Sequence, residues 1–185
     1  AKFMSSSLLG VPVSLITGFV AFRSVDPYYM GVWSTVLVFE TYVNILRFGI
    51  VNGMNRELPY SIGAGEQEKA FSYFRTTYSY TLSNIAIILL FTPIVLLYFE
   101  HTPEYYFALL VLVFRVIILF YSTFLSGTFR SNDDFNKLSN VQFIMLLVKL
   151  LLVPMVFFGF YGFVLMQGFI VMINAVFLHY YIPFK

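Results

Sequence analysis

Three ionisable residues lie in the middle of long apolar stretches of the sequence: Glu40, Arg115 and Lys149. Inside a membrane such a side chain costs at least about 2.5 kcal/mol on insertion scales, so it marks a functional site by default. Each lies about ten residues from the end of its stretch, which at 1.5 Å per residue places all three near the middle of a bilayer. Two cations and one anion leave a positive surplus, which an anionic substrate or the water of a cavity would neutralise. The alternative is a structural ion pair between Glu40 and one of the two cations.

Polar side chains accompany these charges at helical spacing. Residues three, four or seven apart lie on nearly the same face of a helix. On the predicted second and fifth helices, Asn44 lies four residues from Glu40 and Gln142 lies seven residues from Lys149. On the third helix Asn84 follows the hydroxyls of Tyr80 and Thr81, and on the sixth helix Gln167 and Asn174 lie seven residues apart. We therefore expect an inward-facing polar surface that binds substrate. Alternatively, each amide simply bonds one helix to another, at an average of about 0.6 kcal/mol in one measured system.

The elements that must position these residues are long and apolar. The chain is 59% hydrophobic and only 11% charged, and its mean hydropathy is +0.83. A bilayer core of about 30 Å needs roughly 18 or more apolar residues in a helix. Six stretches satisfy this length, approximately residues 4–22, 29–51, 71–99, 105–125, 141–160 and 163–184. The sequence therefore predicts an all-α integral membrane protein with six transmembrane helices.

Basic residues in the connections predict the orientation of these helices. Lys and Arg gather on the cytoplasmic side of membrane proteins, and here all but Arg23 fall on the side of both termini. Both termini are therefore expected in the cytoplasm, together with a loop over residues 51–70. In this loop we expect Asn52-Gly53 to end the second helix and Pro59 to limit any further helix. Arg47 is expected to extend from the second helix to the membrane interface.

Signatures of catalysis are missing from the sequence. It has no cysteine, no zinc-binding His-Glu-x-x-His, no nucleophile elbow and no phosphate-binding loop. Asp133 and Asp134 form an adjacent pair that is typical of a solvated turn. A net charge of +2 is too small to favour nucleic acid. We expect no enzyme, no cofactor and no metal site. The start at Ala1 and the stop after an apolar run suggest a piece of a longer chain.

Three motifs carry a resemblance to a known family. They are DPYYMGVWS (residues 26–34), LRFGIVNGMNRELPYSIGAGEQEKA (46–70) and FLSGTFRSNDDFNKLSNVQF (124–143), and the most specific piece is NGMNRELP (52–59). The chain resembles the amino-terminal lobe of bacterial polysaccharide flippases, the Wzx-type, RfbX-like members of the multidrug/oligosaccharidyl-lipid/polysaccharide exporter superfamily. The resemblance implies two six-helix lobes that face each other across a cavity. This chain is then one lobe, and the second comes from the same chain or from a homodimer.

The resemblance also implies a function in the inner membrane of a bacterium or archaeon. The family moves a lipid-linked oligosaccharide on a polyprenyl pyrophosphate carrier from the cytoplasmic to the outer leaflet by alternating access. Arg115 and Lys149 are then expected to attract the pyrophosphate, while Glu40 holds one cation or exchanges protons. Arg47, Arg56 and Glu57 are expected to form a cytoplasmic gate, unless the loop is held only by local contacts.

Two other functions stay open at this point. A drug exporter of the same superfamily would have a similar fold but would favour an acidic cavity. A membrane-embedded sugar-lipid transferase would need a base or a metal-binding carboxylate that faces one leaflet, and Glu40 lies at the wrong depth for that role.

Overall fold

The protein is all-helical in a computed structural model, which describes residues 2–98, 102–132 and 134–181. These residues contain no β-strand, which confirms the prediction of an all-α protein. The elements are α1 (Lys2–Ser24), α2 (Pro27–Ile45), α3 (Ile50–Gly63), α4 (Gln67–Tyr98), α5 (Pro103–Ser131), α6 (Phe135–Leu152), the 3₁₀ helix η1 (Val153–Phe158) and α7 (Gly159–Tyr180). Lys185, His101 and Asp133, and the last residues of the predicted third and sixth helices, lie outside the described residues.

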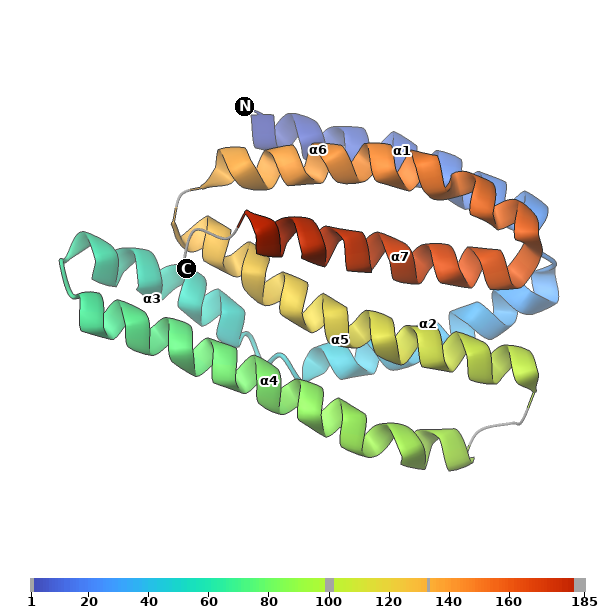
Figure 1. Ribbon diagram of the computed structural model, residues 1–185, viewed down its shortest axis with the longest axis horizontal. Helices are drawn as coiled ribbons and strands as arrows, with labels where there is room; N and C mark the ends of the chain where they lie inside the picture. The colour runs from blue at the N-terminus through green and yellow to red at the C-terminus, as the bar shows by residue number, and fades with distance from the viewer. Residues whose placement is uncertain (1, 99–101, 133, 182–185) are drawn as a thin grey trace.

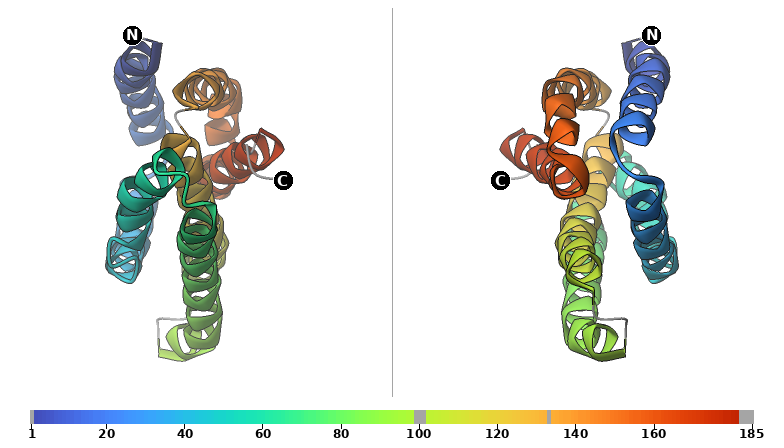
Figure 2. Two further views of the ribbon diagram at one scale, coloured as in Figure 1. Left: turned by 90° about the vertical axis from the view of Figure 1, so that its left-hand side faces the viewer. Right: turned by 90° about the vertical axis from the view of Figure 1, so that its right-hand side faces the viewer.

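The helices run side by side along one long axis, with successive passes in opposite directions (Figure 1). Helix α5 lies in the middle and packs on α7, α2, α4 and α3, whereas α1 packs on α6. The end views in Figure 2 place α4 at one edge of the bundle and α1 with α6 at the other. The start of α1, the α3–α4 turn and the end of α7 all lie towards the same end of the molecule (Figure 1).

Three helical stretches are long and apolar enough to span a membrane, and a fourth qualifies if the bent pair α2 and α3 counts as one span. The three are Gln67–Leu97, Pro103–Ser131 and Phe135–Tyr180. Helix α1 contains a shorter apolar stretch, Leu8–Ser24. The structure therefore shows three or four helices that are long and apolar enough to span a membrane, while six separate spans remain a prediction.

The stretch Phe135–Tyr180 folds back on itself at η1. In Figure 1, α6 runs away from the end that holds the start of α1, and α7 returns beside α5. Gly159, at the end of η1, has φ +72°, which favours glycine because it lacks a Cβ. A Cβ on Gly162 would meet the carbonyl oxygen of Met155, so the hairpin also needs a small residue there. These two glycines let one long apolar sequence form two packed helices.

The prediction of a loop over residues 51–70 is wrong, because residues 50–63 form helix α3. The helical path breaks earlier, where Phe48 has φ +41° and Gly49 has φ +70°, and α2 and α3 meet at an angle of 44°. Gly53 and Pro59, expected to end helices, lie inside α3. Glycine at 49 adopts the left-handed conformation without the clash that a Cβ would cause, so it determines where the chain bends.

Helix α3 is held against the end of α5 by a close contact at a glycine. A Cβ on Gly127 would lie 2.7 Å from Val51 and 3.0 Å from Met54. Ser131 also donates a hydrogen bond to the side-chain oxygen of Asn55, at 3.3 Å. Met54 and Leu58 are buried there against Phe124 and Phe129. This packing is what turns a sequence of low apolar content into a stable helix.

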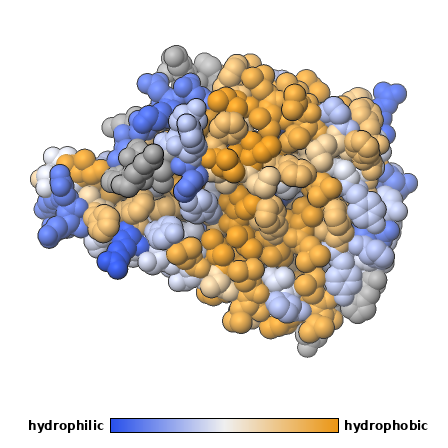
Figure 3. Space-filling view, in the orientation of Figure 1, coloured by the Kyte–Doolittle hydropathy of each residue, from blue (hydrophilic) through white to orange (hydrophobic). Residues whose placement is uncertain are grey.

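Apolar side chains dominate the face of the molecule in Figure 3, and hydrophilic residues gather at the end formed by α3 and the start of α4. That end projects beyond α1, α6 and α7 in Figure 1. The pattern agrees with an apolar band in lipid and with a helical hairpin tip in water.

Candidate functional site

A buried ion pair joins α2 to α5 inside the bundle. Arg115 Nη1 lies 3.1 Å from Glu40 Oε2, and the two side chains are only 18% and 13% exposed. The guanidinium carbon of Arg115 also lies 6.0 Å from the centre of the Trp33 ring, which is buried. The predicted proximity of Glu40 and Arg115 is therefore observed, on helices that pack directly on each other.

Arg47 belongs to the same group of charges, which differs from the expectation that it reaches the membrane interface. Its guanidinium lies over the Phe120 ring, 4.7 Å from the ring centre, and interacts electrostatically with Glu40. Its Nε and Nη2 atoms are buried. The break after α2 explains the difference, because it turns the chain at Arg47 instead of continuing the helix outwards. The structure thus replaces Lys149 by Arg47 as the second cation near Glu40.

The break exposes a backbone carbonyl that helix α4 satisfies. In a continuous helix the Leu46 carbonyl would accept the Ile50 amide, but that amide bonds to the Arg47 carbonyl instead, at 3.1 Å. The Leu46 oxygen accepts the Tyr80 hydroxyl at 2.9 Å and the Asn84 amide at 3.2 Å. Irregular backbone is tolerated at membrane depth only where protein or water satisfies it. Tyr80 and Asn84 therefore satisfy the free carbonyl of Leu46 and stabilise the helix break beside the charged residues.

Several polar atoms of this group have no hydrogen-bond partner among the described residues. They are Glu40 Oε2, Asn44 Oδ1, Nε and Nη2 of Arg47, and Nε of Arg115. The ion pair itself is close, but the Glu40 oxygen receives no well-aligned hydrogen bond from it. Buried polar groups are usually satisfied by protein or by water. The unpaired donors and acceptors make this group, which we call the α2 break site (Glu40, Asn44, Arg47, Asn84 and Arg115), a place for a polar ligand or for water.

A small pocket lies beside Arg47 at the break. Its lining includes Tyr80, Thr81, Asn84 and Phe120, and its volume is about 10 Å³. That is about the room that one buried water needs. In the observed conformation the site is therefore closed to a large headgroup.

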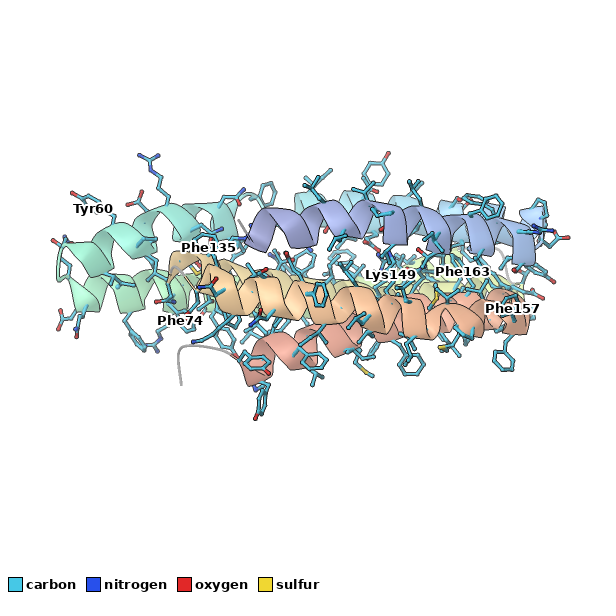
Figure 4. The ribbon with its side chains drawn as sticks, turned by 90° about the horizontal axis from the view of Figure 1, so that it is seen from above. Tyr60, Phe74, Phe135, Lys149, Phe157 and Phe163 are labelled. Carbon is cyan, nitrogen blue, oxygen red and sulfur yellow. The ribbon has the colours of Figure 1, made fainter. Side chains whose placement is uncertain are left out.

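Lys149 lies away from the α2 break site. Its Nζ donates a hydrogen bond to the Ser14 hydroxyl, at 2.9 Å, and α6 packs on α1 and α7. Figure 4 shows Lys149 between the ribbons of α6 and α1. We expected Lys149 to lie near Glu40 because both residues were placed at the same depth in the bilayer. A contact also requires that the two helices are neighbours. Gln142 lies on α6, and Gln167 and Asn174 are half-buried on α7.

Arg56 and Glu57 form an exposed ion pair on α3, with 3.5 Å between Nε and Oε1 and with 88% and 43% of the side chains exposed. Among the described residues, no ion pair links them to the turn between α5 and α6, where Lys137 pairs with Asp134. Within the part of the chain that the structure describes, Arg56 and Glu57 therefore have no ion-pair partner on another element, and a contact with a second lobe stays a prediction.

Sequence reasoning missed the importance of Arg47 and of the bend at Gly49. The signal was present as Arg47-Phe48-Gly49, a cation next to a glycine inside an apolar stretch. The described residues contain no group of three or more His, Asp or Glu side chains that could hold a metal ion.

Known proteins do not identify the chain. No protein-family model matches it, and the searches of curated proteins and of solved structures give no significant match. The resemblance to polysaccharide flippases stays a prediction that rests on the motifs, while the described residues form an all-helical fold with helices long and apolar enough to span a membrane.

Proposed function

We propose that the chain is one lobe of a membrane transporter that moves an anionic lipid-linked oligosaccharide from the cytoplasmic to the outer leaflet. The observation that carries the proposal is the α2 break site, where Arg115 forms an ion pair with Glu40 and a second guanidinium, Arg47, lies within electrostatic range of the same carboxylate. A charge surplus of this kind is costly in a membrane unless an anion or water compensates it. A phosphate group of the lipid carrier provides such an anion.

The arrangement of the bundle supports a transport role for this site. Discontinuous helices that expose backbone groups near charged residues are the usual binding elements of secondary transporters. The α2–α3 break has this form, and Tyr80 and Asn84 fix its free carbonyl. In the proposed mechanism the phosphate binds Arg47 and Arg115, while Glu40 neutralises Arg115 when the site is empty. Alternating access then requires the second lobe, from the same chain or from a second copy.

The proposed orientation puts both termini in the cytoplasm of a bacterial or archaeal inner membrane. Basic side chains support it, since Arg56, Lys69, Arg75, Arg130 and Lys137 all belong to the end of the bundle that holds the α3–α4 and α5–α6 turns. Arg23, at the end of α1, lies at the opposite end. This is the charge bias that cytoplasmic loops show. Six crossings of the membrane are part of this proposal.

The test is a flipping assay with the full-length protein in vesicles and a fluorescent sugar-lipid whose outer-leaflet fraction is measured with an impermeant quencher. We expect Arg47→Gln and Arg115→Gln to reduce the initial rate at least about tenfold, as expected for the loss of charge-assisted hydrogen bonds. Arg23→Gln, an exposed cation at the other end, is the matched control and should keep the rate. Equal rates in all three variants would contradict the proposed site.

A further inference from the structure

A second feature adjoins the α2 break site: an apolar groove between α2, α4 and α5. Its volume is about 270 Å³, and its walls include Phe39, Val43, Ile87, Phe91, Leu109 and Val113. Thr92 also lines it, but its hydroxyl donates to its own helix, to the carbonyl of Ile88 at 2.7 Å. The side chains that line the groove therefore offer a ligand no free hydrogen-bond donor.

The groove and the α2 break site follow each other along the same three helices. Leu46 lines the groove, and its carbonyl is bound by Tyr80 and Asn84, which line the small pocket at Arg47. On α5, Val116 belongs to the groove and Phe120, one helical turn further, belongs to the pocket. On α4 the apolar part extends from Ile87 to Val95, which is about 12 Å at 1.5 Å per residue. The groove and the α2 break site together form one path, which is cationic at Arg47 and apolar along the groove.

We propose that this path binds a lipid phosphate with a single hydrocarbon chain: the chain lies in the α2–α4–α5 groove, and the phosphate binds at Arg47 once the small pocket beside it, about 10 Å³ in the observed conformation, has opened. The unpaired Nε and Nη2 of Arg47 supply charge complementarity for the phosphate. The groove that adjoins this cation has a volume of about 270 Å³, which suits one chain. The inference rests on the proposed function and deepens it, because it assigns a place to the lipid part of the substrate.

The two parts of the site have different roles. Lipid tails are as apolar as the groove, so moving a chain from the bilayer into it gives little driving force. Affinity must then come mainly from the headgroup at Arg47, whereas the groove selects one chain and fixes its direction. A two-chain phospholipid would leave one chain outside, and a neutral alcohol would lack the charge contact.

The experiment uses farnesyl phosphate with a photoreactive group at the end of its chain, added to the full-length protein in zwitterionic nanodiscs. We expect the adducts to lie on the groove walls, within residues 91–95 and 109–113. Unlabelled farnesyl phosphate should compete, while farnesol and phosphatidylglycerol should not. Arg47→Gln should weaken the competition about tenfold, as expected for the loss of a charge-assisted hydrogen bond.

Variants that fill the groove separate this site from ordinary bilayer contact. Ile87→Phe and Val113→Phe narrow it from opposite walls and should each reduce the adduct yield. Leu90→Phe, on α4 but 71% exposed outside the groove, is the control and should keep it. Adducts spread over exposed residues such as Leu90, or equal competition by phosphatidylglycerol, would overturn the inference. Specific adducts without any flipping would instead keep the lipid site and contradict the transporter.

Discussion

The hydroxyl of Tyr80 on α4 donates a hydrogen bond to the carbonyl oxygen of Leu46, 2.9 Å away, where the helical path between α2 and α3 is broken. Asn84, one turn further along α4, donates to the same oxygen at 3.2 Å. Two side chains of one helix thus replace the backbone amide that a continuous helix would supply. The bend, and the position of Arg47 beside it, depend on this contact.

This shared acceptor predicts a non-additive pair of substitutions. Tyr80→Phe or Asn84→Leu alone leaves one hydrogen bond on the Leu46 oxygen, so each should cost about 0.6 kcal/mol, the average in membrane proteins. The double variant leaves a buried carbonyl without a partner and should cost about 1 to 3 kcal/mol more than one variant alone. A double-mutant cycle on unfolding in detergent measures this. Ser83→Ala, at an exposed hydroxyl of α4, should have no effect. Strict additivity would contradict the shared role.

Two glycines should respond to alanine in opposite directions. Gly49 has φ +70°, so Gly49→Ala should destabilise the protein by about 1 to 2 kcal/mol. Gly53 lies inside α3 with open space at its Cβ position, so Gly53→Ala should stabilise it by about 0.5 to 1 kcal/mol. Thermal unfolding of the two variants locates the bend. The reverse order of stabilities would place the left-handed residue at Gly53, as the sequence motif suggested.

The charged group should tolerate the loss of an arginine better than the loss of its carboxylate. Removing one partner of a buried ion pair typically costs about 3 to 5 kcal/mol. Glu40→Gln leaves two guanidiniums together without an anion, whereas Arg115→Gln leaves Arg47 near Glu40. We therefore expect Glu40→Gln to lower the unfolding temperature more than Arg115→Gln does. Lys149→Gln, in a separate contact with Ser14, serves as the comparison. Equal losses from Glu40→Gln and Arg115→Gln would show that Arg47 does not share the carboxylate.

Close packing of α3 on α5 predicts a strong effect at Gly127. A Cβ there would lie 2.7 Å from Val51, so Gly127→Ala should destabilise the protein by about 1 to 3 kcal/mol through overpacking. Adding Val51→Ala should restore part of the loss because it removes the clash. Gly31→Ala, with no atom near the new Cβ, is the control. If Gly127→Ala proves as stable as the parent, α3 does not lie against α5 as described.

Substitution in the exposed Arg56–Glu57 pair on α3 distinguishes a gating role from that of an ordinary surface ion pair. Arg56→Ala should change stability by less than about 1 kcal/mol, because an exposed ion pair contributes little. If α3 closes the cytoplasmic side against a second lobe, the same variant should reduce flipping while membrane insertion stays normal. Unchanged flipping would leave Arg56 and Glu57 as a solvated pair without a gating role.

The sequence predicted the helical class and an ion pair of Glu40 with either Arg115 or Lys149, because apolar length and opposite charges at one depth are properties of the chain alone; the structure selects Arg115. It misplaced Lys149, since depth along a helix does not tell which helix lies beside it, and α6 packs on α1. It also placed the end of the second helix at Asn52-Gly53, where tertiary packing of Met54 and Leu58 keeps a helix intact. A helix that continued past Arg47 would carry this side chain towards the membrane interface, so the sequence also placed Arg47 away from Glu40.

In the proposed function, the arginines of the α2 break site meet an anionic lipid substrate. Because the chain has no cysteine, Arg47→Cys and Arg115→Cys each introduce one thiol that a membrane-impermeant reagent can label without background. We expect both thiols to be labelled in the full-length protein and to be protected by lipid-linked oligosaccharide. No labelling with or without the lipid, in protein shown to be correctly inserted, would mean a buried structural ion pair and would contradict the claim.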